Sequence, residues 1–173
     1  MKTKNVKFEQ GLTDVEIKQI EKIYDIKFPG SLKKFLMAGL PISEGFYNWR
    51  DVTKENVSNI RDAIESPLIT IEKEPTQVYW NDDWGNEPVN EEEFKAEIIK
   101  RLKKAARLIP IFSHRYMPMN LSEDPPVISV CGGDVIYYGI DLEDYFMREF
   151  GEEKCEVIYF KDVEHIPFWT DIM

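Results

Sequence analysis

The chain has 173 residues, of which 43% are hydrophobic and 13% aromatic, and its formal net charge is −10. This length and composition predict one globular domain with a substantial core. The acidity argues against a nucleic acid as a direct ligand, because phosphate binding is driven by Lys and Arg, and no apolar run approaches the roughly 18 residues that span a bilayer.

Residues 12–41 are predicted to form two helices. Thr13 can cap the first helix, and Glu16 stands where the reciprocal partner of a capping box is expected. Apolar residues then recur at helical spacing, which predicts a buried stripe. Ser31 can cap a second, shorter helix, which Gly39 is expected to end.

The aromatic-rich stretch 45–51 is predicted to be an edge or short strand followed by a turn. Thr53 can cap a third helix, which we expect to end near Pro67 because proline disrupts a helix interior, with a strand over 68–71. Asn90 can cap a longer helix that has acidic residues at its start and basic residues at its end. Those charges complement the helix dipole.

The second half of the chain is organised around a predicted β-hairpin. Two β-rich runs, 127–131 and 134–138, flank Gly132-Gly133, and a two-residue glycine loop supplies the positive φ of a tight turn. The register places apolar pairs on one face: Val130 opposite Val135, and Ile128 opposite Tyr137. We expect this hairpin at the centre of a sheet.

The other elements of this half are a strand over 108–112, a helix capped by Asp141, a late strand over 156–160 and an aromatic tail over 165–169. No repeat or Gly/Ser linker interrupts the chain. The predicted fold is therefore a single α+β domain over residues 1–173, with a mainly antiparallel sheet and helices packed against it.

Residue patterns for catalysis or metal binding are weak in this sequence. His114 and His165 lack ligand-type neighbours at helical spacing, which argues against a zinc site. Ser113 precedes His114, but neighbours in an extended segment point to opposite faces. Cys131 has no Lys or Arg near it in the sequence that would favour a reactive thiolate, and we expect it to be buried. Cys131 and Cys155 are both predicted to be reduced thiols in a cytoplasmic protein.

Glycine patterns for phosphate binding and the carboxylate order of an EF-hand are also missing. We therefore expect no catalysis, no metal and no cofactor. One alternative is an enzyme or small-ligand site, which would need a closed polar pocket formed by the side chains of His114, Arg115, Tyr116 and Asp134.

The stretch 78–93 combines large aromatic side chains with carboxylates and contains no basic residue. Trp80 and Trp84 enclose Asp82 and Asp83, and aromatic anchors ringed by charge can build an interface with a basic protein. The alternative is that both tryptophans fill the core and that the acids belong to a solvated loop.

Several segments together resemble the SUKH superfamily, which holds fungal cell-wall assembly regulators and many bacterial immunity proteins. They are LTDVEIKQIEKIYDIKFP, SLKKFLMAG, FYNWRD, WNDDWGNEP, LIPIFSHRYMP, PPVISVCGGDVIYYG, DLEDYF and IPFW. The resemblance implies one α+β domain that binds without catalysis. In bacteria it implies an immunity protein that neutralises a cognate polymorphic toxin, for example a basic nuclease.

The sequence hypothesis assigns toxin binding to an acidic, aromatic surface. Its residues are Trp80, Asp82, Asp83, Trp84 and Glu87, with Tyr47, Trp49 and Asp51 beside them. The alternative function is an intracellular scaffold or regulatory interaction protein, as the fungal members suggest.

Overall fold

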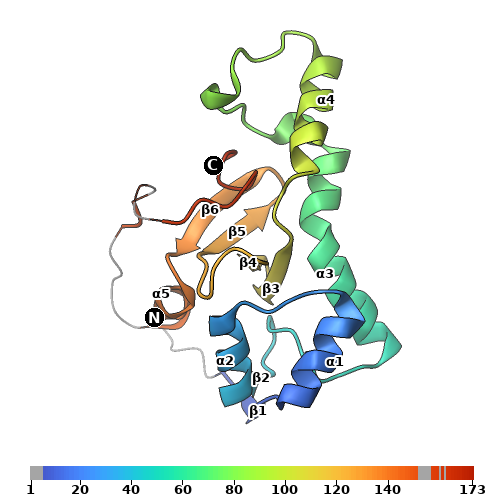
Figure 1. The fold of residues 1–173 in the computed structure, drawn as a ribbon, viewed down its shortest axis with the longest axis vertical. Helices are drawn as coiled ribbons and strands as arrows, with labels where there is room; N and C mark the ends of the chain where they lie inside the picture. The colour runs from blue at the N-terminus through green and yellow to red at the C-terminus, as the bar shows by residue number, and fades with distance from the viewer. Residues whose placement is uncertain (1–5, 152–156, 160, 162) are drawn as a thin grey trace.

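The computed structural model describes residues 6–151, 157–159, 161 and 163–173. Within them, a four-stranded antiparallel sheet lies in the middle of the molecule, with helices on both sides of it (Figure 1). Its strands, in their spatial order, are β3 (Leu108–Phe112), β4 (Arg115–Pro118), β5 (Val127–Cys131) and β6 (Asp134–Gly139). A second antiparallel sheet pairs β1 (Phe8–Gln10) with β2 (Gly39–Pro41). The predicted α+β fold is confirmed.

The first helix, α1 (Asp14–Tyr24), begins with the predicted capping box. The backbone N–H of Glu16 donates to Thr13 Oγ1 at 3.2 Å, and the N–H of Thr13 donates to Glu16 Oε2 at 2.7 Å. The predicted cap of the second helix, α2 (Gly30–Ala38), is wrong, because α2 begins behind Pro29 without a side-chain cap. Instead, the N–H of Ser31 donates to the carbonyl of Glu123 at 2.8 Å. This bond satisfies one of the backbone N–H groups at the start of α2 that have no partner within the helix.

The third helix, α3 (Lys54–Lys73), begins at the predicted Thr53 cap but runs through Pro67. Both the predicted end at Pro67 and the predicted strand over 68–71 are therefore wrong. Ile60, Ile64, Pro67 and Ile71 recur at helical spacing, and all are buried. Burial of this continuous stripe outweighs the backbone hydrogen bond that proline cannot make.

Two further helices, α4 (Glu91–Leu102) and α5 (Leu142–Phe150), start at their predicted caps. Asn90 Oδ1 accepts from the backbone N–H groups of Glu92 and Glu93 at 2.9 and 3.2 Å. Asp141 Oδ1 accepts from the N–H of Asp144 at 2.7 Å.

The β5–β6 hairpin has the predicted register, with Val130 opposite Val135 and Ile128 opposite Tyr137. Gly132 has the positive φ, 61°, that the turn needs. A Cβ on Gly133 would lie 2.4 Å from the carbonyl oxygen of Gln77. The second glycine therefore allows the backbone at Gln77 to lie close to the hairpin turn. The predicted central position is wrong, because β3 and β4 both add on the β5 side and leave β6 at an edge.

Both faces of the four-stranded sheet pack against other elements. Ile109 and Met117 belong to a cluster that contains side chains of α1, α2 and α5. Ile128 belongs to a second cluster with side chains of α4 and the C-terminal segment, in which Trp169 is fully buried and donates its indole N–H to the Ala106 carbonyl at 2.7 Å. The sheet therefore separates two packed layers.

Two predicted strands are not found as such. In the stretch 45–51, Phe46 forms a single bridge with Phe112, and the neighbouring residues form turns. Residues 157–159 are irregular rather than a strand, and positions 156 and 160 lie outside the described residues. Within the described ranges, no helix has the length and apolar character that a membrane crossing requires.

Candidate functional site

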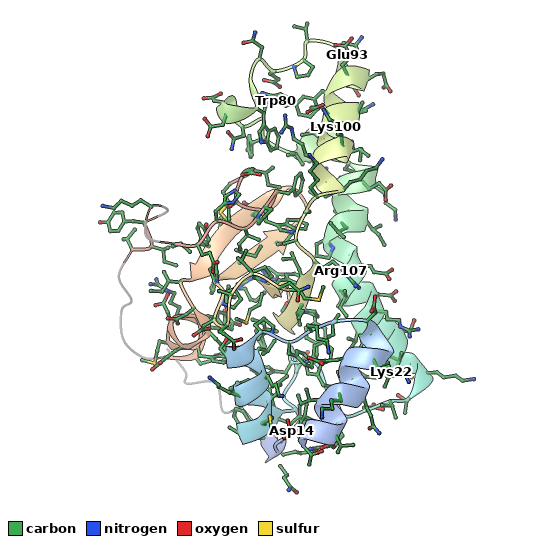
Figure 2. The ribbon with its side chains drawn as sticks, viewed as in Figure 1. Asp14, Lys22, Trp80, Glu93, Lys100 and Arg107 are labelled. Carbon is green, nitrogen blue, oxygen red and sulfur yellow. The ribbon has the colours of Figure 1, made fainter. Side chains whose placement is uncertain are left out.

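Residues 79–93, which we call the acidic protrusion, extend from one end of the molecule. Figure 1 shows this segment looping out beyond the sheet and returning into α4. It contains the 3-10 turn η2 (Asp82–Trp84) and the first turn of α4. Its six carboxylates are accompanied by no Lys, Arg or His within the segment. Figure 2 places Trp80 and Glu93 at this end and Asp14 and Lys22 at the opposite end.

The two tryptophans of the protrusion are half-buried and support it from inside. The rings of Trp80 and Trp84 meet edge to face at 5.3 Å, and Trp80 also contacts Phe94 of α4 at 5.5 Å. The guanidinium carbon of Arg101 lies 4.4 Å from the centre of the Trp84 ring, within the range of a cation–π interaction. We call these four residues the aromatic support.

Hydrogen bonds fix the backbone of the protrusion over this support. The indole N–H of Trp80 donates to the carbonyl of Gly85 at 2.8 Å. Asn81 Oδ1 accepts from the N–H of Asp83 at 2.8 Å, and its amide donates to the carbonyl of Asp171 at 2.7 Å. The loop is therefore tied both to itself and to the C-terminal segment, and this limits its conformational freedom.

The six carboxylates of the protrusion are exposed, and those of its loop are uncompensated. Asp82, Asp83 and Glu87 form no ion pair with any residue in the described part of the chain. By contrast, Lys95 Nζ lies 2.7 Å from Glu91, and the hydrogen bond from Lys95 lowers the pKa of that carboxyl. Most of the uncompensated charge thus lies in the loop, since Glu93 is the one acid in the first turn of α4 that has no ion pair with another described residue.

The other predicted contact residues lie away from the protrusion. Trp49 is only 2% exposed, and its ring packs on Tyr24 and Phe28 at 5.5 and 5.0 Å, in the cluster around α1. Trp49 is therefore a core residue, and its predicted place on the binding surface is corrected. The spacing of residues in the sequence does not reveal that the side chain at position 49 packs against α1.

Tyr47 and Asp51 flank Trp49 and are half-buried. The Tyr47 hydroxyl donates to the carbonyl of Ser113 at 2.7 Å, and Asp51 Oδ1 accepts from the N–H of Thr53 at 2.9 Å. Both side chains thus hold local turns, and Tyr47 packs against the cluster that contains side chains of α1. The structure does not bring the two predicted groups together.

Ser113 and His114 do contact each other, contrary to the expectation from an extended segment. Ser113 Oγ lies 3.2 Å from His114 Nδ1, because Ser113 has a φ of 49° in the β3–β4 turn. Both side chains are exposed. Desolvation of the ring, followed by the charge of Arg115, lowers the pKa of His114 and so favours its neutral form.

Arg115 braces the sheet rather than lining the alternative polar pocket. Its guanidinium donates to Ser129 Oγ at 3.0 Å, stacks 3.9 Å from the Tyr138 ring and lies 3.8 Å from Glu149. Tyr116 is buried on the other face of the sheet, and Asp134 is exposed at the hairpin turn. The four side chains of that alternative therefore do not converge.

Cys131 is exposed, so its predicted burial is wrong. Successive side chains of a strand point to opposite faces of the sheet, and the side chain of Val130 points to the packed face. Cys131 therefore points to the opposite face, next to the turn. Cys155 lies outside the described residues. A search of the described residues finds no group of three His, Cys, Asp or Glu side chains arranged to hold a metal ion.

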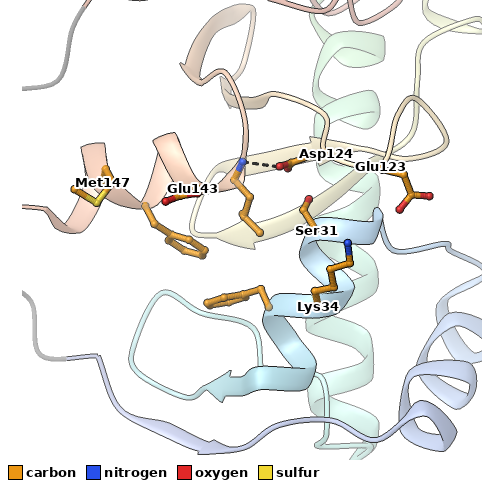
Figure 3. A pocket seen from close by; sticks show the side chains of 9 residues that line it. Ser31, Lys34, Glu123, Asp124, Glu143 and Met147 are labelled. Atoms are coloured by element: carbon orange, nitrogen blue, oxygen red, sulfur yellow. Dashed lines mark hydrogen bonds between the residues drawn. The ribbon is translucent and has the colours of Figure 1, made fainter.

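A concave surface lies between α2 and α5, and sequence reasoning missed it. This α2–α5 groove has a volume of about 450 Å³, and Phe35, Leu142, Phe146 and Met147 contribute its apolar part. Figure 3 shows Ser31 and Lys34 on one side and Glu143 and Met147 on the other. The helical spacing of Phe35 and Phe146 predicts only burial and carries no signal of an opening between the helices.

Comparison of the chain with protein-family models, with curated proteins and with solved structures finds no significant match. The SUKH resemblance and the functions that it implies therefore stay predictions from the sequence.

Proposed function

We propose that this chain is a SUKH-type immunity protein that acts in the cytoplasm by binding a basic cognate toxin, without catalysing a reaction. The observation that carries the proposal is the set of exposed, uncompensated carboxylates of Asp82, Asp83 and Glu87, displayed on the acidic protrusion.

Charge complementarity supports a basic partner. An acidic surface accelerates encounter with a cationic protein and disfavours wrong partners through like-charge repulsion. Toxins that act on nucleic acids are themselves basic, because they neutralise phosphates with Lys and Arg. An acidic inhibitor would therefore occupy the surface that such a toxin needs for its substrate.

The internal hydrogen bonds and ring contacts of the protrusion support the same proposal. Trp80 is hydrogen-bonded to Gly85 and packed on Trp84 and Phe94. A surface that is already ordered loses less conformational entropy on binding. Beside the carboxylates, Tyr79 is 75% exposed and Val89 is fully exposed, which provides apolar contact area next to the charges.

The proposal is tested by co-expressing the chain with the toxin domain encoded by the neighbouring gene. We expect rescue of growth and a complex that survives size-exclusion chromatography. The double variant Asp82→Lys/Asp83→Lys should lose rescue. The matched control is Asp62→Lys/Glu65→Lys, which changes two exposed acids of α3 and gives the same net charge.

Each outcome of this experiment has a defined meaning. If the wild-type chain rescues growth and Asp82→Lys/Asp83→Lys rescues it equally well, the protrusion is not part of the binding surface. Failure of the wild-type chain to rescue or to form a complex would contradict the immunity function and favour the scaffold or regulator alternative.

A further inference from the structure

The α2–α5 groove exposes a continuous apolar surface. The rings of Phe35 and Phe146 face each other from the two helices with centroids 4.6 Å apart, and Met147 beside them is 48% exposed. Phe35 also contacts the ring of Phe8 at 6.2 Å, and Phe8 is itself largely exposed. Apolar side chains thus cover the groove and extend beyond it toward β1.

The rim of the groove is acidic. Glu123, Asp124 and Glu143 line it together with a single cation, Lys34 (Figure 3). Asp124 accepts from the backbone N–H of Leu142 at 3.3 Å, and this hydrogen bond does not neutralise its charge. Glu123, Glu143 and Lys34 form no ion pair with other described residues. The rim therefore carries two more negative charges than positive ones.

We propose that the α2–α5 groove binds a linear segment of a partner protein in which a large apolar side chain is flanked by Lys or Arg. A volume of about 450 Å³ lies in the range of binding pockets. Aromatic and aliphatic anchors that enter such pockets dominate the energy of protein interfaces. The flanking cations complement the acidic rim, and the flexible side chain of Met147 adapts to the shape of the anchor.

Charge also argues against a second copy of this chain as the occupant. A twofold dimer through this groove would place identical acidic rims opposite each other, and like charges repel. The groove lies at α2 and α5, at a distance from the acidic protrusion along the long axis of the molecule (Figure 1). This inference therefore goes beyond the proposed function and does not depend on a toxin partner.

The test uses a defined probe, the capped peptide Lys-Lys-Leu-Phe-Lys-Lys, added to the full chain with 13C-labelled methionine methyl groups. We expect a saturable chemical shift change at the Met147 methyl and none at Met117, which is buried in the core. Two control peptides separate the contributions: Lys-Lys-Ser-Ser-Lys-Lys keeps the charge without the anchor, and Glu-Glu-Leu-Phe-Glu-Glu keeps the anchor with reversed charge.

Variants of exposed rim residues locate the charge effect without disturbing the core. In Glu123→Lys/Glu143→Lys the peptide should bind about fivefold more weakly, since two exposed ion pairs are lost. The control Asp62→Lys/Glu65→Lys gives the same net charge on α3 and should change the affinity less than about twofold. Unaltered backbone spectra of both variants show that they are folded.

Three results would overturn the proposal. The first is no shift at Met147 up to about 5 mM peptide, a concentration that detects even millimolar affinity. The second is a chemical shift change with the serine peptide that equals the change with the Leu-Phe peptide, or a loss of affinity that is the same in both double variants. Either result would mean that the peptide binds through nonspecific charge attraction alone. The third is a shift at Met147 that grows with protein concentration in the absence of peptide, which would assign the groove to a second copy.

Discussion

The aromatic support predicts that Trp84 stabilises the fold although it lies in a surface loop. Replacing Trp84 with Ala removes its edge-to-face contact with Trp80 and the cation–π contact with Arg101. The ring pair contributes about 1 kcal/mol, and the cation at a partly exposed site contributes about 0.5–1 kcal/mol. The half-buried side chain adds about 1 kcal/mol of apolar burial.

These contributions overlap, so we expect Trp84→Ala to lower the free energy of unfolding by about 2 kcal/mol, which for a chain of this length lowers Tm by about 4–8 °C. The assay is urea unfolding followed by far-UV circular dichroism. Tyr79→Ala is the matched control, because Tyr79 lies in the same loop but is 75% exposed, and it should change stability by less than about 0.5 kcal/mol. Equal effects of the two substitutions would refute the support role of Trp84.

The remaining predictions concern single contacts elsewhere in the fold. Gly133→Ala should destabilise by about 1–3 kcal/mol in urea unfolding, because its Cβ would lie 2.4 Å from the Gln77 carbonyl. Ile98→Ala should cost about 2–5 kcal/mol in the same assay, because Ile98 is fully buried. The hydrogen bond from Arg50 lowers the pKa of Glu16 to about 2, so its stabilisation is present above the ordinary value of 4.5 and is lost as the pH falls toward 2. Thermal unfolding of Glu16→Gln should therefore differ most from wild type above pH 5 and converge with it near pH 2; a constant difference would contradict this.

Local signals in the sequence predicted most helix starts and the hairpin register. Thr13, Thr53, Asn90 and Asp141 all cap as expected, because a cap depends on residues within one turn. The continuation of α3 through Pro67 was not predicted, because this helix is stabilised by tertiary burial of its apolar stripe rather than by local helix propensity.

The candidate site was predictable only in part. The exposed carboxylates follow from the charge pattern of 79–93, but whether a tryptophan is core or surface depends on distant elements. Trp49 is buried by residues of α1, whereas Trp84 is covered on one side by Arg101 of α4. The α2–α5 groove depends on how two helices separated by more than 100 residues are spaced, and no local pattern encodes that spacing.

The association rate with the toxin domain tests the central claim most directly, namely that the acidic protrusion captures a basic protein. Stopped-flow measurements over a range of salt concentrations should show Asp82→Lys/Asp83→Lys associating about tenfold more slowly, with a weaker salt dependence. Asp62→Lys/Glu65→Lys should stay close to the wild-type rate at physiological salt, because its charges lie outside the interface. An unchanged rate and salt dependence in Asp82→Lys/Asp83→Lys would contradict the claim.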